Sequence, residues 1–481
     1  MSLKADGPLY ITLDQGGHAS RALVFDACGT LQAKGLREVR VHHPQPEWVE
    51  QDPEELVNSL REAIGDALQN LGTKSPLFAA VGLATQRSSI VCWDRITGQA
   101  LSPVISWQDR RAHTWLTRFA PHAHDVHAIT GLPLSAHYGA SKLRWCLDHL
   151  PAVMQAQAQG RLAIGPLASF LVFRFTEEHS LVVDPANGAR TLLYNLKTQN
   201  WDAGLLHLFD IPLCALPACV PTRHVFGQIT IAGRLVPLTI VTGDQSAALF
   251  AHGAPRANSA YLNMGTGAFV QRITGNSLHH SPQLLTGIVL QDIHDSTYVL
   301  EGTVNGAGAA LQWVESELGL EDLEQQLPEW LASSSEPPLF LNGIAGLGAP
   351  FWVADFESRF MAEAEPWKKA VAVAESIVFL IQANLDLLQD LSAPLDEIVA
   401  SGGLSWYDGM CQRISDLSRL PLHRPAEYEA TARGTAWLLA GKPQYWVEPQ
   451  PGLWFQPGAN PALGARYRQW RAALAEALAI R

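Results

Sequence analysis

Two stretches of the chain share one local plan, in which a strand, a glycine-containing turn and a second strand follow one another. Residues 10–26 read YITLDQGGHASRALVFD, and residues 261–273 read YLNMGTGAFVQRI. In each stretch an apolar run stops at small residues and a second apolar run returns, which is typical of a β-hairpin. Successive free N–H groups in such a turn form a concavity that suits phosphate oxygens. Most glycine-containing hairpins bind no ligand, but two of them in one chain predict a duplicated phosphate-binding domain.

The size and composition of the chain indicate a globular protein with more than one domain. It has 481 residues, 47% hydrophobic and 17% charged, and a chain of this length exceeds one ordinary core. The 34 basic and 46 acidic residues give a net charge of −12, which argues against nucleic acid or an anionic membrane as the main partner. No apolar run is long enough to span a membrane and no secretory signal is recognisable, so we expect a cytoplasmic protein.

The cysteines and histidines indicate neither a disulfide framework nor a metal site. The six cysteines are scattered without a CxxC pair, which is typical of reduced, partly buried cysteines. The 17 histidines show no ligand spacing, and the adjacent pairs at residues 42–43 and 279–280 are expected on the surface.

Strands and helices alternate along most of the chain, which predicts an α/β architecture. Asp52 followed by Pro53 and two glutamates is typical of a helix start, and an apolar stripe from Leu56 to Leu71 continues the helix. Residues 366–391 predict one long amphipathic helix. A loop at residues 232–236 is the expected boundary, which divides the chain into domains 1–241 and 242–481.

A series of short motifs lies along the chain in a fixed order. The motifs are EWVEQDP at residues 47–53, TQR at 85–87, ISWQDRR at 105–111, SKLRWCLD at 141–148, GDQSAAL at 243–249, GTG at 265–267 and GLGAPFW at 346–352. With these motifs the chain resembles the FGGY carbohydrate kinases, and within them the glycerol kinase-like branch. The resemblance covers nearly the whole chain. It implies an α/β, actin-like ATPase fold in which two ribonuclease-H-like domains flank a cleft, with ATP held mainly by the second.

The resemblance assigns roles around a transferred phosphoryl group. Transfer to an alcohol requires in-line positioning, neutralisation of phosphate charge and a group that takes the hydroxyl proton. Asp244 matches the family's general base, whereas the local sequence alone also allows a helix N-cap acid. Asp14 is implied to orient Mg²⁺, and its alternative is hydrogen bonding within the turn.

The nucleotide-binding residues implied by the resemblance lie in both halves of the chain. They are Gly16, Gly17, His18 and Arg21 in the first hairpin, Thr266 and Gly267 in the second, Gly308 and Gln312 after it, and Gly402, Gly403 and Tyr407 at the adenosine turn. Without the resemblance, Arg21 would be an exposed strand charge and residues 306–313 an ordinary helix start. A tyrosine at position 407 could stack on adenine, and packing beneath the loop is the equal alternative.

The acceptor-binding residues implied by the resemblance come from the first half of the chain and from the GDQ segment. They are Arg87, Ser88, Trp107, His137, Asp244 and Gln245. The local sequence alone would make Arg87 a surface residue and Trp107 part of a core.

The chain departs from the family where the chemistry is expected. Gly17 and His18 replace two threonine hydroxyls of the first hairpin, and losing one hydroxyl donor typically costs about 0.5–1.5 kcal/mol. Ser88 stands at the position of a glutamate and His137 at that of a tyrosine, with Tyr138 beside it. Both glycines of a later family segment are absent from residues 358–363. These changes put glycerol in doubt as the acceptor more than they affect the family.

We therefore expect an ATP- and Mg²⁺-dependent kinase of a small polyol or sugar, with glycerol as the first acceptor to test. A ketose or another alditol is the alternative acceptor, and a catalytically weak relative that senses sugar or nucleotide is the alternative function. An actin- or chaperone-like ATPase would share the hairpins but leaves Arg87, Trp107 and the GDQ segment unexplained. We expect no nucleic-acid or membrane partner, and a homodimer as the assembly.

Overall fold

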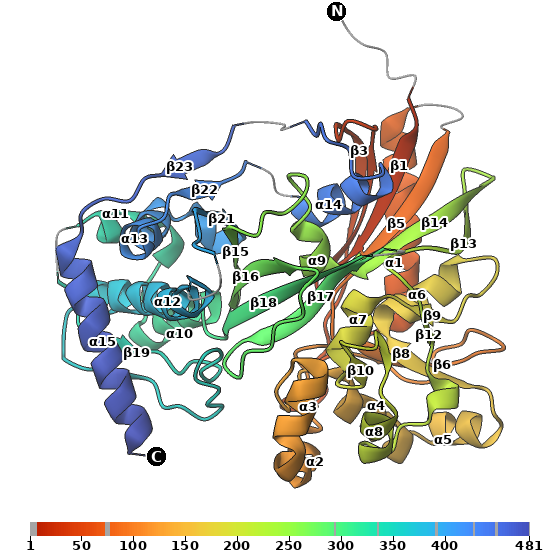
Figure 1. Ribbon diagram of the computed structural model, residues 1–481, viewed down its shortest axis with the longest axis horizontal. Helices are drawn as coiled ribbons and strands as arrows, with labels where there is room; N and C mark the ends of the chain where they lie inside the picture. The colour runs from red at the N-terminus through yellow and green to blue at the C-terminus, as the bar shows by residue number, and fades with distance from the viewer. Residues whose placement is uncertain are drawn as a thin grey trace, which may run out of the picture.

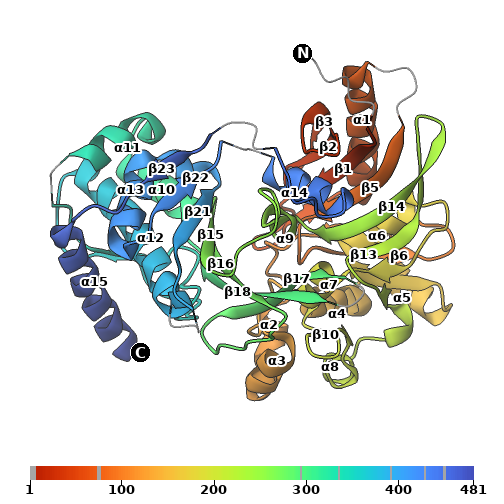
Figure 2. The same cartoon turned by 45° about the horizontal axis from the view of Figure 1, so that its top comes forward.

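The computed structural model describes residues 7–72, 77–292, 295–333, 336–389, 393–426, 429–447 and 451–480. Two large β-sheets form the centres of two α/β domains that lie side by side (Figures 1 and 2). Each sheet contains one of the two glycine-containing hairpins, so the duplicated plan expected from the sequence is confirmed.

The first sheet has six strands in the order β13-β14-β5-β1-β2-β3. Its strands are β1 (Leu9–Gln15), β2 (Ala19–Phe25), β3 (Leu31–Glu38), β5 (Phe78–Thr85), β13 (Arg223–Ile231) and β14 (Arg234–Gly243). Helices α1 (Pro53–Leu71) and α6 (Leu167–Phe175) pack on one face, and α14 (Ala430–Leu439) packs on the other. Strands β1, β5 and β14 are parallel and end at the same edge, where Asp14, Thr85 and Gly243 lie.

The second sheet has seven strands in the order β17-β18-β16-β15-β21-β22-β23. Its strands are β15 (Ser259–Met264), β16 (Ala268–Gly275), β17 (Leu285–Gln291), β18 (Ser296–Val304), β21 (Glu397–Ser401), β22 (Leu422–Arg424) and β23 (Leu453–Phe455). The helices that build its core are α10 (Gly308–Leu318), α11 (Leu323–Ala332), α12 (Pro366–Gln389), α13 (Asp408–Ser418) and α15 (Pro461–Ala479).

A smaller layer belongs to the first domain, and all of it except β4 follows β5 in the chain. Its four-stranded sheet, in the order β4-β7-β6-β8, consists of β4 (Glu50–Gln51), β6 (Ile90–Asp94), β7 (Val104–Ile105) and β8 (Leu162–Pro166). Its helices are α2 (His113–Leu116), α3 (Ala123–Thr130), α4 (Gly139–His149), α5 (Pro151–Ala158), α7 (Pro185–Gly188) and α8 (Ala203–Leu208). This layer matters for function because it carries Trp107 and His137.

The helix start expected at Asp52 is confirmed. The Asp52 carboxylate accepts hydrogen bonds from the amides of Glu54 and Glu55, and Pro53 occupies the first helical position of α1. Residues 232–236, expected as a loop between domains, are instead a tight turn and the start of β14 within the first sheet. Ala232 and Gly233 have φ angles of 50° and 73°, the left-handed conformation that a two-residue hairpin turn needs.

Helix α12 is the one described helix that is long and apolar enough to cross a membrane, but 89% of its most apolar window is buried inside the molecule. Glu375, an acid within that apolar stretch, is buried and forms ion pairs with Arg466 at 2.6 Å and Arg413 at 3.5 Å. Arg466 belongs to α15 and Arg413 to α13. Helix α12 is therefore the central core helix of the second domain.

The two domains share an apolar interface. One cluster joins Leu23 and Ile240 of the first sheet to Val289 and Val299 of the second, with residues of α14 between them. Helix α14 therefore returns to the first sheet although it lies late in the chain, and Figure 1 shows it beside β1 and β5. The division into 1–241 and 242–481 stays a proposal.

Candidate active site

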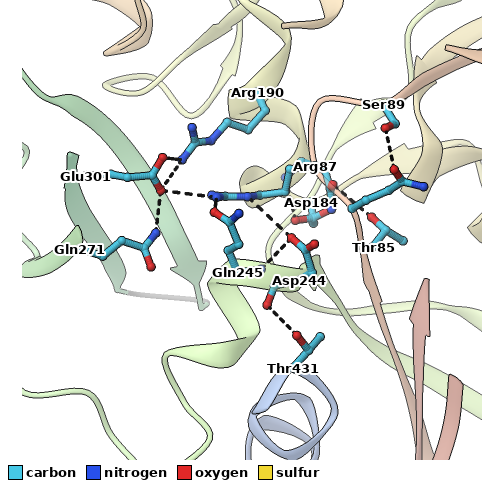
Figure 3. Close-up of polar contacts among 12 residues, drawn as sticks. Thr85, Arg87, Ser89, Asp184, Arg190, Asp244, Gln245, Gln271, Glu301 and Thr431 are labelled. Atoms are coloured by element: carbon cyan, nitrogen blue, oxygen red, sulfur yellow. Dashed lines mark hydrogen bonds and ion pairs between the residues drawn. The ribbon is translucent and has the colours of Figure 1, made fainter. Parts of the chain in front are cut away.

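Three of the residues expected at the acceptor site meet at the end of β14. The strand ends at Gly243 and α9 (Asp244–Ala248) begins at the next residue, which places the Asp244 carboxylate at the edge of the first sheet. Arg87 follows β5, and its Nε lies 4.0 Å from Asp244 Oδ1 (Figure 3). Gln245 accepts a hydrogen bond from Arg87 through its side-chain oxygen. The N-cap of α9 is Gly243, so Asp244 is not the N-cap acid that the local sequence also allowed.

A buried carboxylate from the second domain holds Arg87 from the other side. Glu301, on β18, is 1% exposed and lies 3.4 Å from Arg87 Nη2. Arg190 donates to both Glu301 oxygens at 3.1 and 3.0 Å, and Gln271 donates to one of them at 2.6 Å (Figure 3). Burial raises the pKa of Glu301, but the two guanidinium groups outweigh it, so the net pKa lies below the usual value. Glu301 is therefore ionised and links the two domains through the site.

The first hairpin places a second carboxylate at the same sheet edge as Asp244. Asp14, at the end of β1, is 6% exposed, and its Oδ2 lies 3.4 Å from Arg21 Nη1. Arg21 also lies 3.6 Å from Glu429. Burial raises the pKa of Asp14 to about 7, with Arg21 opposing and the charges of Asp244 and Glu429 adding to the rise.

The protonation state of Asp244 suits a proton acceptor. Its position in the cleft raises the pKa of this carboxyl above the usual value by desolvation, and the charge of Arg87 partly offsets the rise. A carboxylate with a raised pKa takes a proton more readily than an ordinary one. The Asp244 main-chain carbonyl accepts from Thr431 at 3.3 Å, so α14 helps to fix this residue.

One buried lysine joins the turns that carry three residues expected at the acceptor site. The Lys142 ammonium, on α4, donates to the carbonyl oxygens of Ser88, Ser106 and His137 at 2.7, 3.0 and 2.8 Å. It thereby ties together the three turns that carry Arg87, Trp107 and His137. The Trp107 and His137 rings are 5.6 Å apart. Burial, with nearby positive charges adding to it, lowers the pKa of His137 well below the usual value, so its imidazole is neutral at neutral pH.

Replacing Lys142 with methionine should loosen all three turns at once. Burial lowers the pKa of Lys142, yet the three carbonyls use all three N–H groups of an ammonium, which fits a positioning role. We expect the KM for the acceptor to rise roughly 10–100-fold, in line with lost hydrogen bonds to a charged group, while the KM for the nucleotide stays near wild type. Steady-state kinetics with either substrate varied measures this split. The control is Lys369→Met, which removes a surface pair with Glu363 at 2.7 Å; equal losses in both variants would contradict the role.

The second hairpin is packed on the start of α10. The turn closes through the amide of Gly265 and the carbonyl of Gly267 at 2.8 Å, and the amide of Gly308 donates to the Gly265 carbonyl at 2.9 Å. A Cβ at position 308 would lie 2.8 Å from that carbonyl, so the close approach requires glycine. Thr266 is exposed at the tip, where its hydroxyl is available to a ligand.

The first hairpin is anchored through its carbonyls and leaves space at its tip. The carbonyls of Gly16 and Gly17 accept from Gln86 at 3.4 Å and Gln51 at 2.9 Å. His18 is exposed, and a Cβ at Gly17 would find only Gln86 Oε1 within 4 Å, at 3.9 Å. Neither glycine has a positive φ. The turn is therefore open toward the cleft without needing glycine for its backbone conformation.

The turn expected to hold adenosine packs on the second hairpin. Gly402 has a φ of 88° and packs on the Met264 backbone, which joins this turn to the second hairpin, whereas Gly403 has open space around its α-carbon. Tyr407 packs partly against the core of the second domain, in agreement with the alternative of packing beneath the loop. Gln312 is exposed on α10.

A small enclosed pocket of about 60 Å³ lies between α9 and the second sheet. Its wall includes Gln245, Asn263, Phe269, Gln271 and Ser401. The pocket therefore lies between Gln245 and strands β15, β16 and β21, which lead to the second hairpin and to Gly402.

The donor set around Asp14 fits Mg²⁺ bound together with phosphates. No group of three or more histidine, cysteine, aspartate or glutamate side chains that could hold a metal ion occurs in the ranges described above. Magnesium in kinase sites is commonly held by one or two carboxylates together with phosphate oxygens and water. A buried carboxyl whose pKa is raised to about 7 by burial and neighbouring acids is a position where a divalent cation would favour ionisation.

Several residues of the site received no role in the sequence analysis. Arg190 and Gln271 complete the Glu301 network. Lys142 lies within the SKLRWCLD motif, but the motif did not show that it joins the turns that carry Arg87, Trp107 and His137. One signal was available in the sequence: Glu301 is the single charged residue within the strand β18. Arg190 and Lys142 bind partners far away in the sequence, which local spacing does not indicate.

Comparison with known proteins places this geometry in one family. The models for the N-terminal and C-terminal domains of the FGGY family of carbohydrate kinases match residues 9–251 and 260–441. A glycerol kinase from Acinetobacter baylyi is 36% identical over 443 residues, covering 90% of this chain and 89% of that protein. A glycerol kinase from Deinococcus radiodurans is 34% identical over 447 residues, covering 91% of this chain and 89% of that protein.

Solved structures show the same fold. A crystal structure of Plasmodium falciparum glycerol kinase with ADP superposes with a TM-score of 0.88 at 24% identity, covering 99% of both chains. A xylulose kinase from Rhodospirillum rubrum gives a TM-score of 0.85 at 21% identity, covering 97% of this chain and 98% of that one. The fold is therefore the actin-like ATPase fold that the sequence implied.

Proposed function

Because the chain belongs to the FGGY family of carbohydrate kinases, we propose that it transfers the γ-phosphoryl group of ATP to a hydroxyl of a small polyol or sugar, with Asp244 as the general base. The observation that supports these roles best is the position of Asp244 at the end of β14. Its carboxylate lies 4.0 Å from Arg87, and Asp14 of the first hairpin lies at the same edge of the sheet. Glycerol is the first acceptor to test, and a ketose or another alditol is the alternative.

The proposed step balances as a simple displacement. The acceptor hydroxyl oxygen forms a bond to the γ-phosphorus, and the bond from that phosphorus to the β–γ bridging oxygen breaks. The hydroxyl proton moves to an Asp244 carboxylate oxygen, and ADP leaves with the bridging oxygen. Arg87 and Gln245, which already contact each other, orient the hydroxyl toward the base.

The nucleotide is proposed to lie across both hairpins. Free backbone amides of Gly17 and His18, together with the Thr266 hydroxyl and the Gly267 amide, would face its phosphates. The adenosine end would lie over Gly403, where the backbone is open, with Gln312 and Tyr407 beside it. When bound near Asp14, Mg²⁺ supplies neutralisation of the β- and γ-phosphate charge.

The test is coupled ADP release across a panel of polyols, ketoses and aldoses. An acceptor that stimulates ADP release well above the rate of the Asp244→Asn variant supports the kinase. If no acceptor does so while the folded protein still binds ATP or a sugar in calorimetry, the catalytically weak sensor is the correct function.

The pH dependence of nucleotide binding tests the metal role of Asp14. Its pKa of about 7 means that the carboxyl holds a proton at pH 6 and is ionised at pH 8. A cation must displace that proton at the lower pH, so we expect Mg-ADP to raise the Tm more at pH 8 than at pH 6. Asp14→Asn should remove most of the difference, whereas the exposed Asp125→Asn should not. An equal stabilisation by Mg-ADP at both pH values in the wild type would contradict the role.

We propose that the protein is cytoplasmic and forms a homodimer. We also propose that it has no nucleic-acid or membrane partner. The net charge of −12 and six free cysteines support this setting. Light scattering coupled to gel filtration measures the assembly.

A further inference from the structure

Helix α14 contacts the short helix α9 at both of its ends. At the first end, the Thr431 hydroxyl donates to the Asp244 carbonyl at 3.3 Å (Figure 3). Beyond the other end, the Ala251 carbonyl accepts from Arg433 Nε at 2.8 Å. Helix α9 has five residues, and its N-cap, Gly243, supplies no side-chain hydrogen bond. Helices this short are held by tertiary contacts, so the contacts with α14 decide how α9 is oriented.

The two helices pack in direct backbone contact. A Cβ at Gly434 of α14 would clash with the Ala247 carbonyl oxygen of α9. A Cβ at Gly29, whose φ is 88°, would likewise overlap the Trp446 ring. The Trp446 indole in turn donates to the Ala251 carbonyl at 3.0 Å. Because packing this close is hardly compressible, a displacement of α14 is transmitted to α9.

The Arg433 guanidinium joins three separate segments of the chain. Arg433 lies within α14 and is 2% exposed. Besides the bond to Ala251, Nη1 donates to the Gly29 carbonyl at 2.7 Å and Nη2 donates to the Val447 carbonyl. The guanidinium also lies over the Trp446 ring, 5.2 Å from its centroid. A planar guanidinium binds several partners in fixed directions, so this side chain fixes the β2–β3 turn, the end of α9 and the segment after α14 relative to one another.

Val447 lies close to the point where the chain leaves the first domain. Helix α14 packs on the first sheet, whereas β22 before it and β23 after it pair with each other in the second sheet. The chain therefore crosses between the two domains on either side of the segment 430–447. A movement of the second domain relative to the first would reach the end of α9 through Val447 and Arg433.

A shift of α9 would change the surroundings of the Asp244 carboxylate. Arg87 Nε lies 4.0 Å from it, and the charge of Arg87 is the largest influence that opposes the rise in pKa caused by burial. Arg190 acts in the same direction and Glu301 in the opposite one. These three groups stay in the protein when Arg433 is replaced, so a change in the titration of Asp244 would report a change in its position.

We propose that Arg433 is a positioning residue for the general base, because it fixes α9 against α14 and thereby holds the Asp244 carboxylate in the geometry that phosphoryl transfer requires. This inference rests on the proposed kinase function and adds a residue outside the cleft on which that function depends. Since Arg433 is buried, it contacts neither substrate, and its replacement should change kcat much more than either KM.

The experiment replaces Arg433 with methionine and measures kcat as a function of pH with saturating Mg-ATP and the best acceptor. We expect kcat to fall roughly 10–100-fold, the usual cost of a small misplacement, with both KM values near wild type. The acid limb of the kcat profile should move to higher pH, because a displaced Asp244 loses part of its attraction to Arg87. Arg433→Lys, which keeps the charge and part of the hydrogen bonding, should restore part of kcat.

The matched control is Arg272→Met. Arg272 is 4% exposed and likewise donates to three main-chain carbonyls, but beside the second sheet. They are the carbonyls of Ala257, Leu388 and Ala393. Both variants lose comparable buried hydrogen bonds, yet the acid limb should move only in Arg433→Met. An unmoved acid limb in that variant, or an equal fall of kcat in both, overturns the inference. If methionine prevents folding at either position, Arg433→Lys and Arg272→Lys are compared in the same way.

A double variant separates this inference from the proposed function. If Arg433 acts through Asp244, Arg433→Met should lower kcat little further in the Asp244→Asn background. A full additional loss would overturn the positioning role and leave the kinase intact. An Asp244→Asn variant as active as the wild type would overturn the general base and this inference together, and so would the absence of any active acceptor.

Discussion

Replacing Asp244 with asparagine is expected to lower kcat by roughly 10²–10⁴-fold, the usual contribution of a positioned general base. Asparagine keeps the size of the side chain and can still contact Arg87, but it cannot take the hydroxyl proton. The KM for ATP should stay near the wild-type value, because Asp244 lies at the acceptor side of the site. Coupled ADP release with the best acceptor measures both constants.

The matched control is Asp52→Asn, which makes the same change outside the cleft. Asp52 caps α1, and asparagine caps a helix about as well as aspartate, so activity and Tm should both be preserved. A kcat for Asp244→Asn above about a tenth of the wild-type value would assign the proton to another group. A large drop in its Tm would instead give Asp244 a structural role.

The residues that motifs identified are those proposed to contact the substrate directly. Arg87, Asp244 and Gln245 were expected together, and the structure brings them into contact at the ends of β5 and β14. Their proximity follows from topology, because the carboxyl ends of neighbouring parallel strands meet at one edge of a sheet. The family resemblance, together with the strand pattern, could therefore predict this part of the site, whereas the local sequence alone would make Arg87 a surface residue.

The roles of the supporting residues could not be predicted from the sequence, for a physical reason. Lys142 acts through backbone carbonyls, which every residue has, so its partners leave no trace in the composition of the chain. Glu301 and Arg87 are 214 positions apart and belong to different sheets. Their pairing depends on how the two domains pack, which local patterns do not specify.

The turn at residues 232–236 shows the same limit at the level of the fold. Its polar and glycine residues indicated an interruption, and a turn is present, but a hairpin within one sheet and a linker between domains have similar local chemistry. Likewise, α14 is an ordinary apolar helix in the sequence, and only the tertiary structure shows that it packs against the first sheet.

Replacing Glu301 with glutamine should have the largest effect on stability. Glu301 is ionised and buried, and it is the counter-charge of both Arg87 and Arg190. Removing one partner of a buried ion pair typically costs about 3–5 kcal/mol, because the remaining charge is left uncompensated. We expect a loss of this size in the free energy of unfolding, together with a lower kcat/KM for the acceptor, since Arg87 loses its support. Chemical denaturation and steady-state kinetics measure the two effects.

The matched control is Glu54→Gln, which removes an exposed carboxylate from its pair with Arg174. Exposed pairs of this kind contribute about 0–1 kcal/mol, so the control should lie close to the wild type. A comparable loss in the free energy of unfolding in both variants would mean that the buried ion pairs of Glu301 contribute no more to stability than an exposed pair.

The double variant Glu301→Gln with Arg190→Gln identifies the cause of that loss. If the loss comes from two uncompensated guanidinium groups, removing one of them should recover part of it, because Arg87 still has Asp244 at 4.0 Å. The double variant should then be more stable than the sum of the two single changes predicts. Strict additivity would show that packing rather than charge balance makes Glu301 important, and the link between the two domains would then be steric.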